Sequence, residues 1–199
     1  MCGRYCIDKD TVREIEKLVW EIEERLKREL AGIYMEAIDI HPANMAPVLT
    51  SGEKGIDCKW LRWGLPGIEG KQLIINARSE SALSKRMFCE SLKRRRIIVP
   101  ASWFYEWSRN KEKNTFYNIS RSVLYMAGFY DRYRDEDRFV ILTTEANDSM
   151  RPVHDRMPLV LDKNEIRAWL SGDCHVESFL HKTPSVLDRQ TEFEQMSLF

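Results

Sequence analysis

The first residues of the chain hold the most reactive grouping in the sequence. They read Met1-Cys2-Gly3-Arg4-Tyr5-Cys6. Excision of an initiator methionine is easy when the next side chain is small, and Cys2 would then carry a free α-amine beside its thiol. Such a 1,2-aminothiol condenses with an aldehyde, first to a Schiff base and then to a five-membered thiazolidine ring. Both groups have ordinary pKa values not far above neutrality, and N-terminal residues that use their own amine are established catalysts.

Cys2 also has a simpler interpretation, as a small apolar residue buried under the first strand. Gly3 and Arg4 favour the reactive interpretation, because glycine allows close approach of a ligand and arginine is a two-pronged donor to phosphate. The chain has 5 cysteines, an odd number without a CxxC pair, which predicts reduced thiols in a cytoplasmic setting. A zinc site built from Cys2, Cys6, Cys174 and His175 matches no standard spacing, so we predict neither metal nor cofactor.

Two further side chains could move protons. Glu106 stands among aromatic residues in Trp103-Phe104-Tyr105-Glu106-Trp107. A buried carboxylate there would suit proton transfer, whereas strand alternation could equally turn it outward to water; the residues leave both open. His154 opens the run His154-Asp155-Arg156-Met157-Pro158. On residue type alone, a structural histidine bonded to Asp155 or to the backbone is the preferred interpretation.

Composition limits the classes of protein. The chain has 199 residues, 43% hydrophobic and 31% charged, with a formal net charge of zero. These values are typical of one globular domain, and we find no signal peptide or membrane-spanning run. A neutral protein needs a local basic patch to bind nucleic acid. Lys93-Arg94-Arg95-Arg96 could extend a phosphate track, but such a run is more often a solvated helix end.

The hydrophobic spacing predicts the elements that must position these residues. Helices are expected from Thr11 to Leu30, with a Thr11–Glu14 capping box and a stop at Gly32, from Ser79 to about Arg96, and after Asp162. Strands are expected at 2–7, 48–50, 56–63, 73–75, 97–99, 116–120, 124–130, 139–144 and 159–161. This order predicts a single α+β domain over residues 2–183, with a curved, mostly antiparallel, barrel-like sheet flanked by helices. Residues 184–199 are predicted to form a flexible tail.

Four separated stretches together carry a resemblance to a known family. They are Met1–Tyr5, Asn76–Glu80, Phe104–Trp107 and His154–Pro158. From Cys2 to about Leu170 the chain resembles the SRAP family, named for SOS response-associated peptidases. The resemblance implies a cytoplasmic, nucleoid-associated protein that binds single-stranded DNA. It also implies covalent coupling of the processed Cys2 to an abasic site as a thiazolidine, which shields the site during the response to DNA damage.

The resemblance also implies a role for each matching position. Cys2 would be the nucleophile, Glu106 the proton shuttle and His154 a second acid or base at the sugar oxygen. Asn76 would hold the N-terminus and the opened sugar by hydrogen bonds. The DNA-binding residues would be Arg4 and Arg78 as phosphate clamps, together with Arg86, Met87, Ile68 and Trp103.

The chain departs from the family pattern at two of these positions. Ile68 stands near where family members often carry a tryptophan wedge, and the neighbouring Glu69 would face phosphates badly. Trp103 replaces the usual glycine, and it could crowd the pocket or stack on a base. Beyond Leu170 the usual family ending is not recognisable.

The C-terminus carries a second resemblance. Gln195-Met196-Ser197-Leu198-Phe199 resembles the pentapeptide by which repair proteins dock on the bacterial sliding clamp; the alternative is a chance match in a polar tail. Three functions therefore stand open: an abasic-site cross-linking protein, with or without strand-cleaving β-elimination; a cysteine peptidase or autoprocessing enzyme using Cys2, Glu106 and His154; and a non-catalytic nucleic-acid-binding module.

Overall fold

The computed structural model describes residues 2–67, 72–171 and 176–192. One sheet has the strand order β15-β10-β9-β1-β2. Its strands are β1 (Tyr5–Ile7), β2 (Ile38–Ile40), β9 (Trp103–Trp107), β10 (Lys113–Asn118) and β15 (Leu187–Glu192). All its pairings are antiparallel. The N-terminal strand therefore lies inside a sheet, directly beside the strand that carries Glu106.

A second sheet closes on itself as a barrel. Its order is β13-β12-β4-β3-β8-β11-β14, with β7 paired to β12, and an additional β11–β12 pairing closes the ring. The strands are β3 (Met45–Ser51), β4 (Ile56–Trp63), β7 (Asn76–Arg78), β8 (Arg96–Ala101), β11 (Leu124–Tyr133), β12 (Glu136–Glu145), β13 (Arg156–Pro158) and β14 (Val160–Leu161). A short hairpin joins β5 (Leu65–Pro66) to β6 (Leu73–Ile74).

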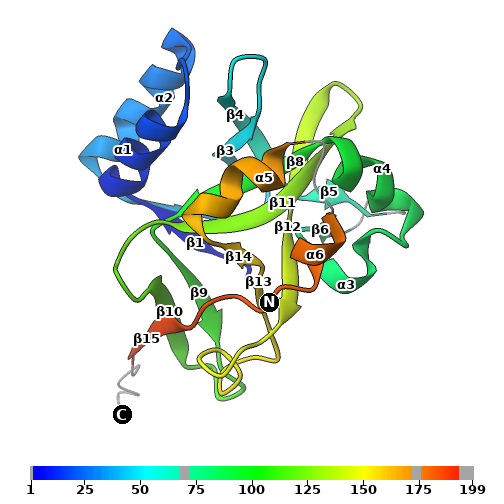
Figure 1. Cartoon of the computed structure of the whole chain (residues 1–199). Helices are drawn as coiled ribbons and strands as arrows, with labels where there is room; N and C mark the ends of the chain where they lie inside the picture. The colour runs from blue at the N-terminus through cyan, green and yellow to red at the C-terminus, as the bar shows by residue number, and fades with distance from the viewer. Residues whose placement is uncertain (1, 68–71, 172–175, 193–199) are drawn as a thin grey trace.

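Helices flank the barrel. They are α1 (Lys9–Leu18), α2 (Glu24–Met35), α3 (Ser79–Ala82), α4 (Arg86–Arg94), η1 (Lys163–Glu165), α5 (Ile166–Leu170) and α6 (Val176–Leu180). In Figure 1, α1 and α2 lie together on one side of the molecule, and α3 and α4 lie on the other. The predicted α+β domain with a barrel-like core is confirmed. In the part of the chain that the structure describes, no helix is both long and apolar enough to span a membrane.

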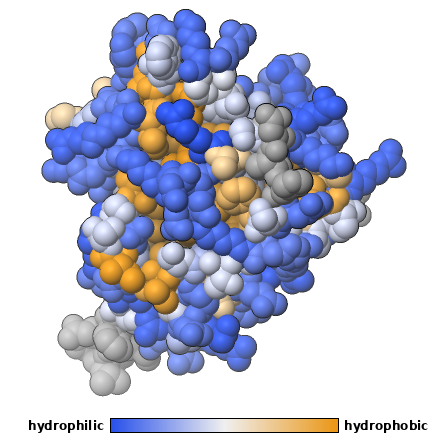
Figure 2. All heavy atoms as spheres, in the orientation of Figure 1, coloured by the Kyte–Doolittle hydropathy of each residue, from blue (hydrophilic) through white to orange (hydrophobic). Residues whose placement is uncertain are grey.

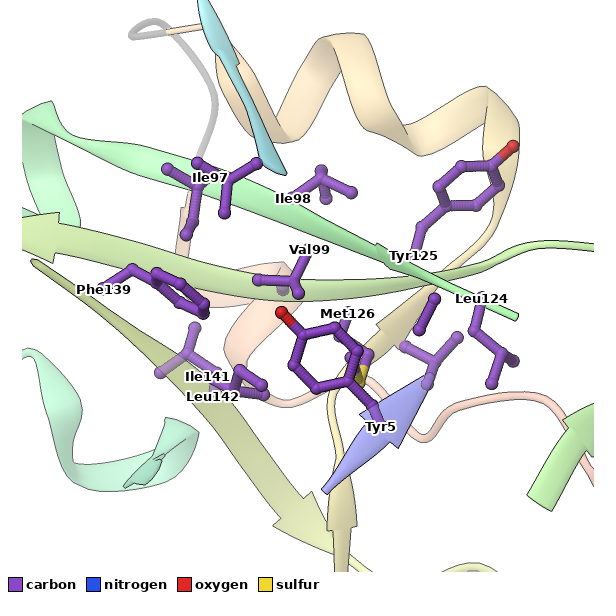
Figure 3. Packing of buried hydrophobic residues seen from close by; sticks show 14 of the residues in the cluster. Tyr5, Ile97, Ile98, Val99, Leu124, Tyr125, Met126, Phe139, Ile141 and Leu142 are labelled. Atoms are coloured by element: carbon purple, nitrogen blue, oxygen red, sulfur yellow. The ribbon is translucent and has the colours of Figure 1, made fainter. Parts of the chain in front are cut away.

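Large aromatic and branched side chains fill the barrel. Tyr5 projects from β1 toward Val99, Met126 and Phe139 (Figure 3), and its own side chain is fully buried. Its ring lies 5.2 Å from that of Trp63, which stacks on Phe139. Burying one such ring contributes about 1.5–3 kcal/mol. Tyr5 therefore anchors the N-terminal segment, and it fixes the position of Cys2 a few residues before it.

The predicted helix over residues 11–30 is wrong. The structure has α1 and α2 instead, with a break between Leu18 and Glu24. The backbone N–H of Trp20 donates to the carbonyl of Ile56 at 3.1 Å, which takes the chain off the helical path onto β4. The cap of α1 is also one turn earlier than expected, because the Asp8 carboxylate accepts from the N–H groups of Asp10 and Thr11.

Other boundaries also differ from the predictions. Gly32 lies inside α2 and does not end it. The helix expected from Ser79 to Arg96 is divided into α3 and α4, and residues 73–75 are partly exposed instead of buried. Residues 187–192, within the stretch predicted as a tail, form β15 on the edge of the first sheet.

Candidate active site and nucleic-acid interface

Cys2 is held in place by Asn76. The Asn76 Nδ2 group donates to the Cys2 carbonyl at 2.8 Å, across 74 residues of sequence. Asn76 opens β7, which pairs in parallel with the barrel strand β12 at Ile141. Cys2 itself is only 1% exposed, with its Sγ 3.8 Å from the carbonyl oxygen of Arg4. Two of the predicted site residues therefore meet at the N-terminal segment.

Glu106 is buried beside the same segment. Its exposed fraction is 6%, against 39% for Trp107. The β1–β9 register pairs Tyr5 with Phe104, and the Tyr105 N–H donates to the Arg4 carbonyl at 3.0 Å. Continued by two pairs beyond Tyr5–Phe104, this register brings Glu106 opposite Gly3. The structure thus decides between the two interpretations of Glu106, because its carboxylate points inward instead of into water.

The Cys2 thiol is strongly protonated in this setting. Burial, reinforced by the negative charge of Glu106, raises the pKa of Cys2 to about 12. Loss of solvation penalises the thiolate more than the neutral thiol. At neutral pH the sulfur is therefore a neutral nucleophile next to a buried carboxylate.

His154 lies in a groove that reaches Trp107. The groove has a volume of about 770 Å³, and its walls are residues 107–110, 112 and 151–155. The His154 Nδ1 atom accepts from the Arg156 N–H at 2.9 Å and lies 2.8 Å from Asp155 Oδ1. An Nδ1 that accepts this N–H carries no proton, so the neutral ring has its proton on Nε2. We favour this bond because the Asp155 carboxylate is 85% exposed and can turn to water.

The groove links His154 to Glu106 only indirectly, through Trp107. Trp107 is the residue after Glu106, and it lines the same groove as His154. Among the described contacts, none joins His154 to Cys2 directly. The structure therefore brings Cys2, Asn76 and Glu106 together. His154 lines a groove with Trp107, where it could meet a bound substrate.

Arg4 and Arg78 differ in how available they are for phosphate. The Arg4 guanidinium forms an ion pair with Asp39 and lies 4.8 Å over the Tyr105 ring. A phosphate would have to compete with Asp39 for this side chain. Arg78 is exposed at the end of β7, beside a cleft of about 410 Å³ that it shares with Arg151.

The remaining predicted DNA contacts are dispersed. Arg86 and Met87 lie exposed at the start of α4, with Met87 40% exposed. Trp103 is half-buried, and its ring lies 5.6 Å from that of Tyr117. Ile68 lies outside the described residues.

Sequence reasoning missed three exposed side chains along the groove. Trp107, Arg109 and Arg151 all line it, and each is exposed. An exposed aromatic ring in a groove that also holds arginines can stack on a base while the arginines neutralise phosphates. The signal was present in the sequence, because Trp107 directly follows Glu106 in the aromatic run.

The described residues were also compared with the requirements of a metal site. Within residues 2–67, 72–171 and 176–192, no group of three or more His, Cys, Asp or Glu side chains could hold a metal ion. Two members of the zinc set considered from sequence, Cys174 and His175, lie outside these ranges.

The whole chain was compared with known families and proteins, and it matches one family over nearly its full length. The model of the family described as SOS response associated peptidase (SRAP) matches residues 1–197, so the chain belongs to this family. The resemblance noted from the four motifs is confirmed.

Several relatives carry a more specific name. The chain is 30% identical over 186 residues to the abasic site processing protein YoaM of Bacillus subtilis, covering 86% of this chain and 79% of YoaM. It is 28% identical over 180 residues to the abasic site processing protein YedK of Escherichia coli, covering 85% and 79% of the two chains. A crystal structure of a Bacteroides thetaiotaomicron protein superposes with a TM-score of 0.81 at 21% identity, covering 97% of this chain and 93% of that one. The similarity to this crystal structure supports the assignment of the fold.

Proposed function

We propose that this protein recognises abasic sites in single-stranded DNA and links itself to them covalently through Cys2. The observation that carries the proposal is the hydrogen bond from Asn76 to the Cys2 carbonyl, beside the buried Glu106. Three motifs far apart in the sequence meet at the only residue type that offers an amine and a thiol together. The names of the relatives point to the same lesion.

The chemistry needs a free amine on Cys2 and hence removal of Met1. The amine attacks the aldehyde carbon of the ring-opened sugar, and loss of one water gives a Schiff base. The thiol then adds to the imine carbon, its proton passes to the nitrogen, and the thiazolidine closes. The net change is one new C–N bond, one new C–S bond and one water released.

Each neighbouring residue has a role in this sequence. Glu106 accepts a proton from the attacking amine and returns it to the departing water, as a buried general acid–base. Asn76 holds the Cys2 backbone, and His154 protonates or deprotonates the sugar oxygen from the groove that it lines. Exposed Arg78, Arg109 and Arg151 hold phosphates without reading sequence. Arg4, Arg86, Met87 and Trp103 complete the proposed DNA surface.

A cysteine peptidase built on Cys2 is the alternative. That mechanism needs a thiolate, usually formed by an adjacent histidine. Here burial raises the pKa of the Cys2 thiol to about 12, and the described contacts give Cys2 no histidine partner. These observations favour the aminothiol mechanism, in which the amine attacks first. A lyase reaction can accompany it, because a Schiff base also permits β-elimination of the strand.

The deciding experiment uses single-stranded DNA with one abasic site. Wild-type protein should give an adduct that survives denaturing electrophoresis, and Cys2→Ala should give none. Cys2→Ser should also be nearly inactive, because an oxazolidine is far less stable. Intact mass spectrometry must show that Met1 is absent from each preparation. Peptide cleavage in trans without an adduct would support the peptidase instead.

We also propose that the C-terminal pentapeptide, residues 195–199, docks the protein on a sliding clamp. The motif lies outside the described residues; it follows β15, whose last residue is Glu192 on the edge of a sheet. Deleting residues 195–199 should abolish clamp binding in a pull-down and leave cross-linking intact. Unchanged clamp binding would end this part of the proposal.

A further inference from the structure

Glu80 and Arg156 join the two halves of the candidate site, although neither belongs to the set proposed for the chemistry. Glu80 follows β7 in α3, two residues after Arg78, and Arg156 opens β13, two residues after His154. The Arg156 Nη1 and Nη2 groups donate to the two Glu80 carboxylate oxygens at 2.7 and 2.8 Å. This two-pronged geometry is the strongest form of ion pair between side chains.

The pair is further tied to the barrel. Arg156 Nη2 also donates to the carbonyl of Thr143 at 2.7 Å. Thr143 lies on β12, where it pairs with Arg78 of β7. The Arg156 side chain is only 10% exposed, and its hydrogen bonds lower the pKa of the Glu80 carboxyl, which keeps that group ionised at neutral pH. One guanidinium thus connects β7–α3, β12 and β13.

The same arginine orients the imidazole. Its backbone N–H donates to His154 Nδ1 at 2.9 Å. We propose that the Glu80–Arg156 ion pair positions His154, by fixing the backbone that selects its Nε2–H tautomer and by setting its distance from the β7 residues Asn76 and Arg78. Glu80 and Arg156 are positioning residues, because neither contacts the reacting atoms. This role in cross-linking rests on the proposed function, whereas the effect on the tautomer does not.

Asp155 competes with Arg156 for His154 Nδ1, and this competition makes the proposed positioning of His154 testable. The His154 Nδ1 atom also lies 2.8 Å from Asp155 Oδ1, a carboxylate that would accept a proton from Nδ1. When the Arg156 side chain is held by Glu80, the Arg156 backbone N–H donates to His154 Nδ1. The ring proton of His154 then stays on Nε2, which is a hydrogen-bond donor. When the pair is broken, Asp155 can capture an Nδ1–H tautomer, and Nε2 becomes an acceptor.

The first test measures the tautomer directly in the full-length protein by long-range ¹H–¹⁵N NMR, with His154→Ala to assign the signal. Wild-type His154 should show the Nε2–H form. Glu80→Gln should add the Nδ1–H form, and so should Arg156→Lys, which keeps the charge and loses the fork. The control is Glu136→Gln, which removes the carboxylate of the half-exposed Arg62–Glu136 pair elsewhere in the fold. An unchanged His154 tautomer in a folded Glu80→Gln protein would overturn the proposal.

The second test separates positioning from simple stabilisation. With abasic single-stranded DNA, Glu80→Gln should lower the rate constant of cross-linking by about 10-fold or more, since small misplacements are costly. Its affinity for a strand with a non-reactive abasic analogue should stay within about twofold of wild type. A lower melting temperature with a wild-type rate would contradict positioning. A wild-type protein that forms no cross-link would contradict the proposed function, and the NMR result would still decide the role of the pair.

Discussion

At the residue scale, the burial of Cys2 bears on the order in which bonds would form in the proposed reaction. Its thiol pKa of about 12 leaves almost no thiolate at neutral pH. A buried neutral thiol is a slow first nucleophile but a suitable second one, because it needs only to reach an imine carbon already held by the same residue. In the proposed reaction, burial would also protect the sulfur against oxidation and alkylation until the amine has reacted.

Glu106 gives the sharpest prediction at this scale. We expect Glu106→Gln to lower the rate constant of cross-linking by about 100-fold or more, the usual effect of losing a general acid–base. The amide has nearly the same shape, so noncovalent binding to the strand should persist. Quenched time courses on denaturing gels measure the rate. The control is Glu112→Gln, in the groove lined by Trp107 and His154, which should react like wild type. A wild-type rate in Glu106→Gln would remove the carboxylate from the mechanism.

At the element scale, truncations on either side of β15 test where the folded domain ends. It pairs with β10 from Leu187 to Glu192, and Leu187 is buried. Ending the chain after Glu192 should leave the free energy of unfolding unchanged. Ending it after Val186 should lower that free energy by about 2 kcal/mol or more, the value of one buried leucine. Urea titrations measure both, and equal midpoints would show that β15 adds nothing to the fold.

The same scale shows what local sequence patterns can and cannot predict. Most strands and the hairpin between β3 and β4 follow from alternation and turn residues, because those signals are local. The break between α1 and α2 depends on the carbonyl of Ile56, which no local pattern around Trp20 contains. A polar strand such as β15 likewise has no hydrophobic signal, and only its pairing with β10 makes it a strand.

The candidate site divides in a similar way. The motif set predicted Cys2, Asn76 and Glu106, and the structure brings all three together. The ion pair of Arg4 with Asp39 could not be predicted from the motifs, because it depends on the β1–β2 register that sets Cys6 opposite Asp39. The burial of Glu106 also required the sheet, since strand alternation alone allowed both faces.

At the scale of the whole molecule, charge is spread over the surface while the ionisable groups of the N-terminal strand are buried. Figure 2 shows a mostly hydrophilic face with hydrophobic atoms in the hollows between polar ones. Beneath such a surface, burial raises the pKa of Cys2 and of Cys6 to about 12, and that of Tyr5 well above its ordinary value. These groups stay protonated in the folded protein at pH values where the unfolded chain ionises.

This difference predicts a loss of stability in alkali. Above the ordinary thiol pKa the unfolded chain binds fewer protons than the folded protein, so the free energy of unfolding falls as pH rises toward 12. Each buried thiol contributes up to about 1.4 kcal/mol per pH unit. Urea unfolding from pH 8 to 11 under reducing conditions should therefore show a shallower decline for Cys2→Ala than for wild type. The packing lost with the sulfur lowers stability equally at every pH, so parallel curves would mean that the Cys2 thiol is not held protonated by the fold.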